Sequence, residues 1–239
     1  MDKIKFTVEH FTQTHGRSFI VGDIHGDYDQ FMNLLDGVGF DYDKDICYSV
    51  GDLVDRGNKS LDCFNLLSKS WFKAVRGNHE QFCIDSHHAA QIYKDICVEN
   101  HIKYGGDWFY KLPIGIQKHI VGKLNELPIA LVLTTGNEKV LIVHGDIPDS
   151  CSNLEQLIES IELKNEYTPL IIMMGRKVCT LSNSALFEER DSVKEFGGVD
   201  MVYLGHTNVK NILTHKNYTF VDTGCSSQEH WGRLSIVEI

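Results

Sequence analysis

The stretch Val21-Gly22-Asp23-Ile24-His25-Gly26 places an acid and an imidazole two residues apart, directly after the apolar run 18–21. Further along, over residues 29–38, apolar side chains recur at the spacing of one helical face. We therefore predict a strand, a turn and a helix in this order. Because Asp23 and His25 follow the end of the strand, we expect their side chains to point at one place.

The same order of elements recurs twice more along the chain. Residues 46–50 and 71–75 are β-prone, and a glycine follows each run closely. The two turns read Gly51-Asp52-Leu53-Val54-Asp55-Arg56-Gly57 and Arg76-Gly77-Asn78-His79-Glu80. Between them we expect a helix with Leu61, Phe64 and Leu67 facing inward. Three such units are typical of βαβ folds, in which functional side chains gather at the carboxyl ends of the strands.

From residue 80 to residue 127 the pattern is mostly helical, with a turn at residues 104–108. One amphipathic helix, which ends before Pro128, is marked by Ile116, Ile120, Leu124 and Leu127. Several polar side chains are interpreted without a functional role. Asp27 and Asp29 are expected to cap the first helix. The residues interpreted as surface side chains are Lys59, His87, His88, His101, His119, His215 and His230.

The second half of the chain is richer in β-prone residues. Residues 129–134 and 140–143 flank a polar turn and predict a hairpin that ends at His144. Residues 151–169 are expected to be helix and loop, whereas residues 171–196, which include Arg176, show no clear pattern. Two further β predictions are a strand over residues 201–204, which ends at Gly205-His206-Thr207, and a β meander over residues 212–239.

The bulk properties indicate one ordinary globular domain. A chain of 239 residues can bury a substantial core, and no low-complexity linker divides it, so we expect residues 1–239 to form a single domain. The net charge of −10 argues against a nucleic-acid partner. No apolar run has the length of a membrane span, which argues against a membrane partner.

The cysteines and the N-terminus favour a cytoplasmic protein. The seven cysteines are an odd number without a CxxC pair, so we expect reduced, mostly buried thiols. The first residues, Met1-Asp2-Lys3-Ile4-Lys5, lack the apolar segment of a secretory signal. The sequence gives no prediction of the oligomeric state.

The polar residues at the predicted strand ends form a set of candidate metal ligands. The six candidates are Asp23, His25, Asp52, Asn78, His144 and His206. This mixture of oxygen and imidazole donors suits Mn²⁺, Fe or Zn²⁺ better than Ca²⁺ or Mg²⁺. Six protein ligands exceed what one open catalytic metal takes. Two metals that share a carboxylate, about 3.5–4 Å apart, would use them all, and such a pair suits displacement at phosphorus.

These motifs also resemble a known family. The three turns around Asp23, Asp52 and Asn78 are similar, in order and spacing, to the signature of the phosphoprotein phosphatase branch of the calcineurin-like metallophosphoesterases. Residues 46–85 are especially similar to bacteriophage lambda-type serine/threonine protein phosphatases. The resemblance covers nearly the whole chain, is dense up to residue 85 and is patchier afterwards.

The resemblance implies a role for each candidate residue. Asp23 and His25 would bind one metal, Asp52 would bridge both metals, and the second metal would be bound by Asn78, His144 and His206. A bridging hydroxide would attack phosphorus directly, without a phosphoenzyme. His79 would protonate the leaving group, and Asp55 would orient His79. Arg56 and Arg176 would hold the phosphoryl oxygens.

The implied fold is an α/β/β/α sandwich of two mixed sheets flanked by helices. The implied function is that of a manganese-dependent phosphomonoesterase, a hydrolase that acts on phosphorylated serine and threonine, and also on phosphotyrosine, in proteins or peptides. Two alternatives stay open. A dinucleoside tetraphosphate hydrolase shares the early motifs, although its members usually carry a Trp where Thr207 follows His206. A non-catalytic binding module that retains the fold would be expected to lack a ligand, and none is missing here.

Overall fold

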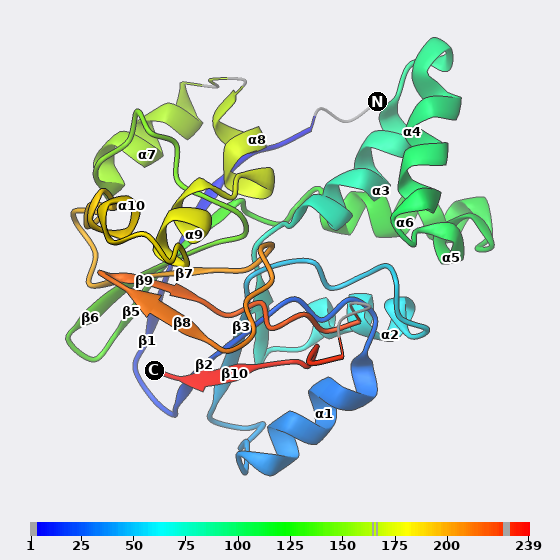
Figure 1. Cartoon of the computed structure of the whole chain (residues 1–239). Helices are drawn as coiled ribbons and strands as arrows, with labels where there is room; N and C mark the ends of the chain where they lie inside the picture. The colour runs from blue at the N-terminus through cyan, green and yellow to red at the C-terminus, as the bar shows by residue number, and fades with distance from the viewer. Residues whose placement is uncertain (1–3, 164, 166, 227–229) are drawn as a thin grey trace.

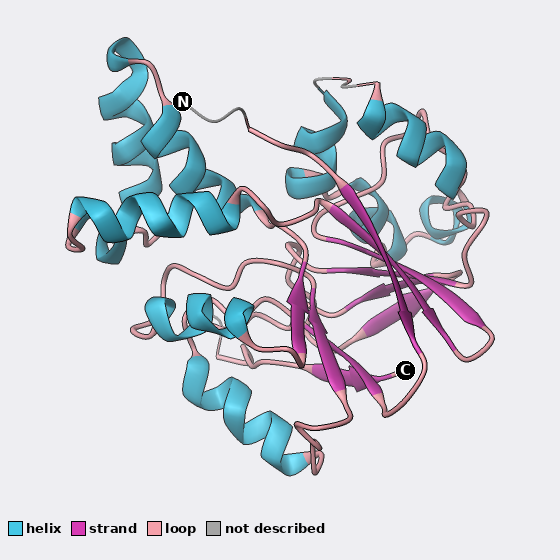
Figure 2. Cartoon of the chain, turned by 180° about the vertical axis from the view of Figure 1, so that it is seen from behind, coloured by secondary structure: helices cyan, strands magenta, loops and turns pink. Residues whose placement is uncertain are grey.

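The computed structural model describes residues 4–163, 165, 167–226 and 230–239, so residues 1–3 of the N-terminal segment considered above lie outside it. Two β-sheets pack face to face, and helices cover their outer faces (Figures 1 and 2). The larger sheet has the order β1 (Val8–Gln13), β5 (Ala130–Thr135), β6 (Glu138–Val143), β7 (Met201–Leu204), β9 (Tyr218–Phe220), β8 (Leu213–His215). The smaller sheet has the order β10 (Ile236–Glu238), β2 (Ser18–Val21), β3 (Ile46–Ser49), β4 (Phe72–Ala74).

Both sheets are mixed. In the smaller sheet β2, β3 and β4 are parallel, and β10 is antiparallel to β2. In the larger sheet β6, β7 and β9 are parallel, whereas β5 and β8 run antiparallel to their neighbours β6 and β9. The carboxyl ends of parallel strands meet at one sheet edge, and the predicted ligands follow these ends: Asp23 after β2, Asp52 after β3, Asn78 after β4, His144 after β6 and His206 after β7.

The helices fall into three groups. One group lies against the smaller sheet: α1 (Tyr28–Gly37), α2 (Ser60–Asn65) and the short 3₁₀ helix η1 (Leu66–Ser68). A second group follows β4 and stands beside the sheets: α3 (Asn78–His88), α4 (Gln91–Lys103), α5 (Asp107–Tyr110) and α6 (Ile114–Leu124). The third group covers the larger sheet: α7 (Leu154–Glu162), α8 (Tyr167–Met174), α9 (Lys177–Ser182) and α10 (Phe187–Asp191).

Three buried apolar clusters hold these layers together. Along β2 the side chains alternate, so that Ile20 enters the cluster between the sheets while Phe19 and Val21 face the helices. On that outer side Phe31 of α1 is fully buried. On the other outer face, α7 contributes Leu157 to the cluster over the larger sheet. Burial of each such side chain stabilises the fold by about 1.5–3 kcal/mol. The predicted α/β/β/α sandwich is confirmed.

Most predicted elements of the first half are present within a residue or two, but the inward face of the second helix is partly wrong. Leu61 is 37% exposed, because the buried face of α2 is carried by Ser60, Cys63 and Phe64, and Leu67 lies beyond the end of α2, in η1. Likewise Ile116 lies on the exposed side of α6. Asp27 caps α1 as predicted, since its carboxylate accepts from the backbone N–H of Gln30.

The expected C-terminal meander is wrong in its last step. Strands β8 and β9 form the predicted hairpin in the larger sheet, but β10 crosses to the smaller sheet and pairs with β2. There the backbone of Ile236–Glu238 covers the edge of β2 that would otherwise be open. Strand β1, for which no prediction was made, lies at the edge of the larger sheet, parallel to β5.

All seven cysteines lie in the described ranges as free thiols, six of them buried, as expected. None of the helices in those ranges combines the length and the apolar character that crossing a bilayer requires.

Candidate active site

The backbone of the site is held in unusual conformations. Five of the predicted functional residues have a positive φ, between 47° and 73°: His25, Asp52, Asp55, Arg56 and His206. Non-glycine residues seldom adopt this left-handed region, and such strain persists where the surroundings fix it. Close packing does so here, because a Cβ atom at Gly77 would lie 2.2 Å from Asp52 Oδ1 and one at Gly205 would lie 2.2 Å from Asp23 Oδ1. Glycine is therefore required at both positions.

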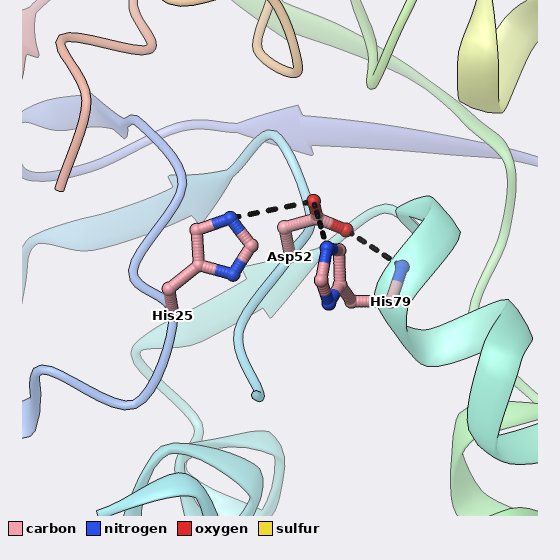
Figure 3. A group of neighbouring side chains, drawn as sticks. All are labelled: His25, Asp52 and His79. Carbon is pink, nitrogen blue, oxygen red and sulfur yellow. Dashed lines mark hydrogen bonds and ion pairs between the residues drawn. The ribbon is translucent and has the colours of Figure 1, made fainter. Parts of the chain in front are cut away.

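Asp52 is the centre of the site. Its Oδ2 lies 3.6 Å from His25 Nε2 and 3.3 Å from His144 Nε2, and Figure 3 shows the carboxylate between His25 and His79. The other ring nitrogen of His25 donates to the carbonyl oxygen of Val54, at 3.1 Å. Because a carbonyl only accepts, Nδ1 of His25 carries a proton, and its Nε2 is left to serve as a ligand in the neutral ring.

Asp52 belongs to two groups of ligand-type side chains. In one group its ligand atom and those of His25 and His79 all lie within 4.8 Å of one another, and in the other the same holds with His144 and His206. Two further predicted ligands adjoin these groups. Asn78 Oδ1 is 3.0 Å from His144 Nε2, and Asp23 Oδ2 is 4.0 Å from His25 Nε2. The six predicted ligands are therefore brought together around Asp52.

The buried charges of the site fit divalent cations. Burial, and then the neighbouring Asp222 carboxylate, raise the pKa of Asp23 well above its ordinary value, and a cation beside these oxygens would reverse that shift. Burial, and then the neighbouring His79, lower the pKa of His25 to about 3. Burial, and then the neighbouring His144, likewise lower the pKa of His206 to about 3. Both rings are thus neutral at pH 7, which is the form that binds metal.

His144 gives a second indication of a cation position. Burial alone would lower its pKa, but Asp52 and Asp23 outweigh burial and raise it to about 10. The ring therefore carries both protons, with Nδ1 bonded to the Val50 carbonyl at 2.8 Å and Nε2 facing Asn78 Oδ1 and Asp52 Oδ2. The proton on Nε2 lies among oxygen atoms that can all bind a metal. A divalent cation at this point would replace it without changing the donor set.

His79 lies beside these groups, but its hydrogen bonds differ. Its Nδ1 donates to Asp55 Oδ2 at 2.8 Å, and the Asp55 carboxylate is fully buried. Its Nε2 lies 3.2 Å from Nη2 of the exposed Arg56, and a guanidinium only donates. The fixed imidazole therefore has one nitrogen on a carboxylate and the other at the surface of the site. This arrangement suits transfer of a proton to a bound molecule.

Arg176 lies on the other side of the site. It directly precedes α9, its side chain is exposed, and its Nη1 donates to the backbone oxygen of His206 at 2.8 Å. A second, longer contact joins Nη1 to Thr207 Oγ1 at 3.4 Å. Arg56 and Arg176 thus approach from different elements, one beside His79 and the other beside His206. Both side chains are exposed, and each guanidinium group offers donors that suit an anion.

The structure adds residues that the sequence patterns did not single out. Glu80 ends the turn 76–80, yet its structural role is visible only in the fold. Its buried carboxylate accepts from four backbone N–H groups, those of Asp52, Leu53, Val54 and Gly77, at 2.8–3.4 Å. These bonds hold the turn that carries Asp52. The position of Glu80 three residues after Gly77, at the start of α3, is the only sequence signal for such a capping role.

The interpretation of His101 as a surface residue is wrong. It is fully buried, and its Nε2 lies 3.1 Å from Asp55 Oδ2. The turn between α4 and α5 folds it under the site, where Trp108 also donates from Nε1 to Asp55 Oδ1, at 2.7 Å. Because α4 has no regular apolar face, the sequence does not indicate that this histidine is buried against Asp55.

Comparisons with known proteins agree with this geometry. Residues 16–210 match the family model of the calcineurin-like phosphoesterases. Serine/threonine-protein phosphatase 2 of Escherichia coli is 31% identical over 224 residues, which are 92% of this chain and 92% of that protein. A symmetrical bis(5'-nucleosyl)-tetraphosphatase of Mannheimia succiniciproducens is 48% identical, but over only 66 residues, 26% of this chain and 24% of that protein. Among solved structures, a serine/threonine phosphatase of Saccharomyces cerevisiae shares the fold, with a TM-score of 0.59 at 16% identity, covering 98% of this chain and 84% of that chain.

Proposed function

This chain belongs to the calcineurin-like phosphoesterase family, and on that premise we propose that it removes phosphate from phosphoserine and phosphothreonine in proteins, with two Mn²⁺ ions as its cofactor. The observation that carries the proposal is the Asp52 carboxylate, whose Oδ2 faces Nε2 of His25 and of His144 at 3.6 and 3.3 Å. One carboxylate that belongs to two ligand groups is the arrangement expected of a dinuclear centre.

The proposed ligands divide around Asp52. Asp23 and His25 would hold one cation, Asn78, His144 and His206 would hold the second, and Asp52 would serve both. When bound, divalent cations supply Lewis acidity, which activates water and neutralises charge on phosphoryl oxygens. Mn²⁺ is proposed because the donors are carboxylate, amide and imidazole; Fe and Zn²⁺ suit the same set.

The side chains around the cations bind the substrate and move the proton. Arg56 and Arg176 hold the phosphoryl oxygens from two sides, where planar guanidinium groups match the geometry of phosphate. Arg56 now donates to His79 Nε2, so an Arg56 that turns to a phosphoryl group frees this nitrogen. Once freed, Nε2 can take up a proton from solvent water. His79 then donates this proton to the leaving oxygen, while Asp55 keeps the ring in place through Nδ1.

The length of the similarity favours a protein phosphatase. The E. coli relative matches 92% of both chains, including the segments that carry His144, Arg176 and His206 in the second half. The tetraphosphatase of M. succiniciproducens has the higher identity, but over about a quarter of each chain. Hydrolysis of dinucleoside tetraphosphates is therefore the second candidate. Phosphotyrosine is a further proposed substrate, since the site holds the phosphoryl group more than its leaving group.

We further propose that the protein works in a reducing compartment, the cytoplasm. All seven cysteines are free thiols.

A comparison of substrates and one variant test the function. Chelator-stripped protein should hydrolyse p-nitrophenyl phosphate only when Mn²⁺ is added, and a phosphoserine peptide with a higher kcat/KM than a dinucleoside tetraphosphate. The His79→Asn variant should lose about 10²–10⁴-fold in turnover of the peptide. A higher kcat/KM for the tetraphosphate would replace the proposal with the second candidate. No turnover of any ester with any divalent metal would favour a non-catalytic binding module.

A further inference from the structure

The carboxylate of Asp55 has more donors than an acid–histidine pair needs. Besides His79 at 2.8 Å, its oxygens accept from His101 Nε2 at 3.1 and 3.2 Å and from Trp108 Nε1 at 2.7 Å. An ionised carboxylate has about four acceptor positions. Oδ2 faces His79 and His101, and Oδ1 faces Trp108 and His101, so three N–H groups bind the carboxylate, and that of His101 is shared between both oxygens.

His101 is itself fixed from behind. Its Nδ1 lies 2.8 Å from the hydroxyl of Tyr110, and Cys83 Sγ is 3.5 Å from its Nε2. Because the carboxylate only accepts, Nε2 of His101 carries a proton, and in the neutral ring Nδ1 accepts from the Tyr110 hydroxyl. The ring also packs closely against Gly106, where a Cβ atom would stand 2.0 Å from it. His101 therefore has one orientation and one tautomer in this packing.

The turn between α4 and α5 joins this arrangement to the phosphate-binding side. The backbone oxygen of Gly105 accepts from the backbone N–H of Arg56 at 3.2 Å, and Gly105 has φ +98°. A side chain at Gly105 would stand 2.6 Å from the Arg56 nitrogen. One short segment thus contacts both Asp55 and Arg56.

We propose that His101 and Trp108 are positioning residues for the cleavage of the phosphoester: they hold the Asp55 carboxylate in one orientation and, through it, hold the His79 imidazole at the leaving oxygen. This inference rests on the proposed function. Loss of either donor leaves a buried acceptor unfilled, so the carboxylate can rotate and His79 loses its alignment. Small displacements of a catalytic group have large effects on rate. The ionised state of Asp55 agrees with this: burial alone would raise its pKa, but the bonds from His101 and His79 hold it below the ordinary value.

Leaving-group dependence distinguishes this role from a structural one. Phenolate leaves poorly without a proton, whereas p-nitrophenolate leaves readily, so phenyl phosphate depends more on the general acid. In Trp108→Phe and His101→Leu we expect kcat/KM for phenyl phosphate to fall about tenfold relative to kcat/KM for p-nitrophenyl phosphate. This loss is smaller than the roughly 10²–10⁴-fold acceleration that general-acid catalysis supplies, because His79 itself is still present. Mn²⁺ binding, measured by titration calorimetry, should be unchanged. His101→Gln, whose amide nitrogen can reach the same oxygens, should retain more of this ratio than His101→Leu.

Matched controls lie away from Asp55. Trp71→Phe alters a tryptophan that packs against Phe31, and His119→Gln alters a histidine on the exposed side of α6. Both should keep the wild-type ratio between the two esters.

An unchanged ratio in Trp108→Phe, or a parallel loss on both esters, would overturn the inference, and Trp108→Phe decides alone if His101→Leu does not fold. If the wild type hydrolyses both esters and the variants keep its ratio of kcat/KM values, only the positioning role is refuted. A wild type that hydrolyses neither refutes the proposed function, and this inference with it.

Discussion

Replacement of Glu80 by glutamine should destabilise the protein far more than a loss of one charge at the surface would. The Glu80 carboxylate is buried and accepts from the backbone N–H groups of Asp52 and Gly77 through Oε2, and from those of Leu53 and Val54 through Oε1. A glutamine retains one oxygen, which can serve two of these donors. Its NH₂ group faces the other two, so two buried N–H groups lose their acceptor.

The magnitude follows from that count. A buried donor without a partner costs about 1–3 kcal/mol, so the two together lower the free energy of unfolding by about 2–6 kcal/mol. The effect should be measured at about pH 8, because burial and then Asp52 raise the pKa of Glu80 to about 7, and the carboxylate is charged above it. Urea unfolding of the chelator-stripped protein gives the free energy without a contribution from bound metal.

Glu126 provides the matched control. It is exposed and pairs with Lys123, three residues earlier, so Glu126→Gln should change the free energy of unfolding by less than about 0.5 kcal/mol. If Glu80→Gln were as stable as this control, Glu80 would not hold the Asp52 turn through these four bonds.

Three further perturbations test other parts of the fold. Gly106→Ala should lower the urea midpoint by the equivalent of about 1–3 kcal/mol, because its Cβ would stand 2.0 Å from the His101 ring; an unchanged midpoint would mean that the ring is not held there. Phe31→Ala should cost about 3–5 kcal/mol in the same assay, since Phe31 is fully buried, and a cost below about 1 kcal/mol would contradict its place in the core. For Asp45, burial alone would raise the pKa, but Arg17 holds it below the ordinary value. The ionised Asp45 therefore stabilises the fold fully above about pH 4, and this stabilisation is lost as the pH falls through the folded-state pKa. The difference in unfolding free energy between wild type and Asp45→Asn should accordingly shrink toward low pH. A difference that stays constant with pH would refute the ion pair.

The turns of the site were predictable because their chemistry is local. A strand of four or five apolar residues that ends at Gly-Asp shows both the element and the ligand, as at Asp23 and Asp52. Parallel strands then bring such turns to one edge, so a group of ligands could be expected without knowledge of the packing. The roles of the individual ligands came from the resemblance and remain predictions.

The misplaced elements depend on partners that are distant in sequence. His101, which we predict at the surface, is instead buried and binds Asp55, 46 residues away in sequence, and α4 shows no apolar face that would indicate this burial. Strand β10 pairs with β2 across almost the whole chain, and nothing in its three residues distinguishes that partner from β9. Such pairings are set by which edge is open in the folded protein, not by local propensity.

The segment 171–196 shows no clear pattern in the sequence for a different reason. Helix α8 reads YTPLIIMM, so apolar residues lie on nearly all its sides and no helical face stands out. The two helices that follow, α9 and α10, are only six and five residues long. Windows this short contain too few turns to show a period. Arg176 was therefore predicted from the resemblance alone, and its position beside His206 came from the structure.

The most direct test of the account is the number of metal ions that each chain binds. Equilibrium dialysis of chelator-stripped protein against Mn²⁺, with metal analysis, should give two ions per chain for the wild type. The Asp52→Asn variant should lose at least one ion, because a single carboxylate serves both proposed sites. Asp45→Asn, which changes a buried acid outside the site, should retain both. One ion or none in the wild type, or two ions bound equally well by Asp52→Asn, would contradict a dinuclear centre built around Asp52.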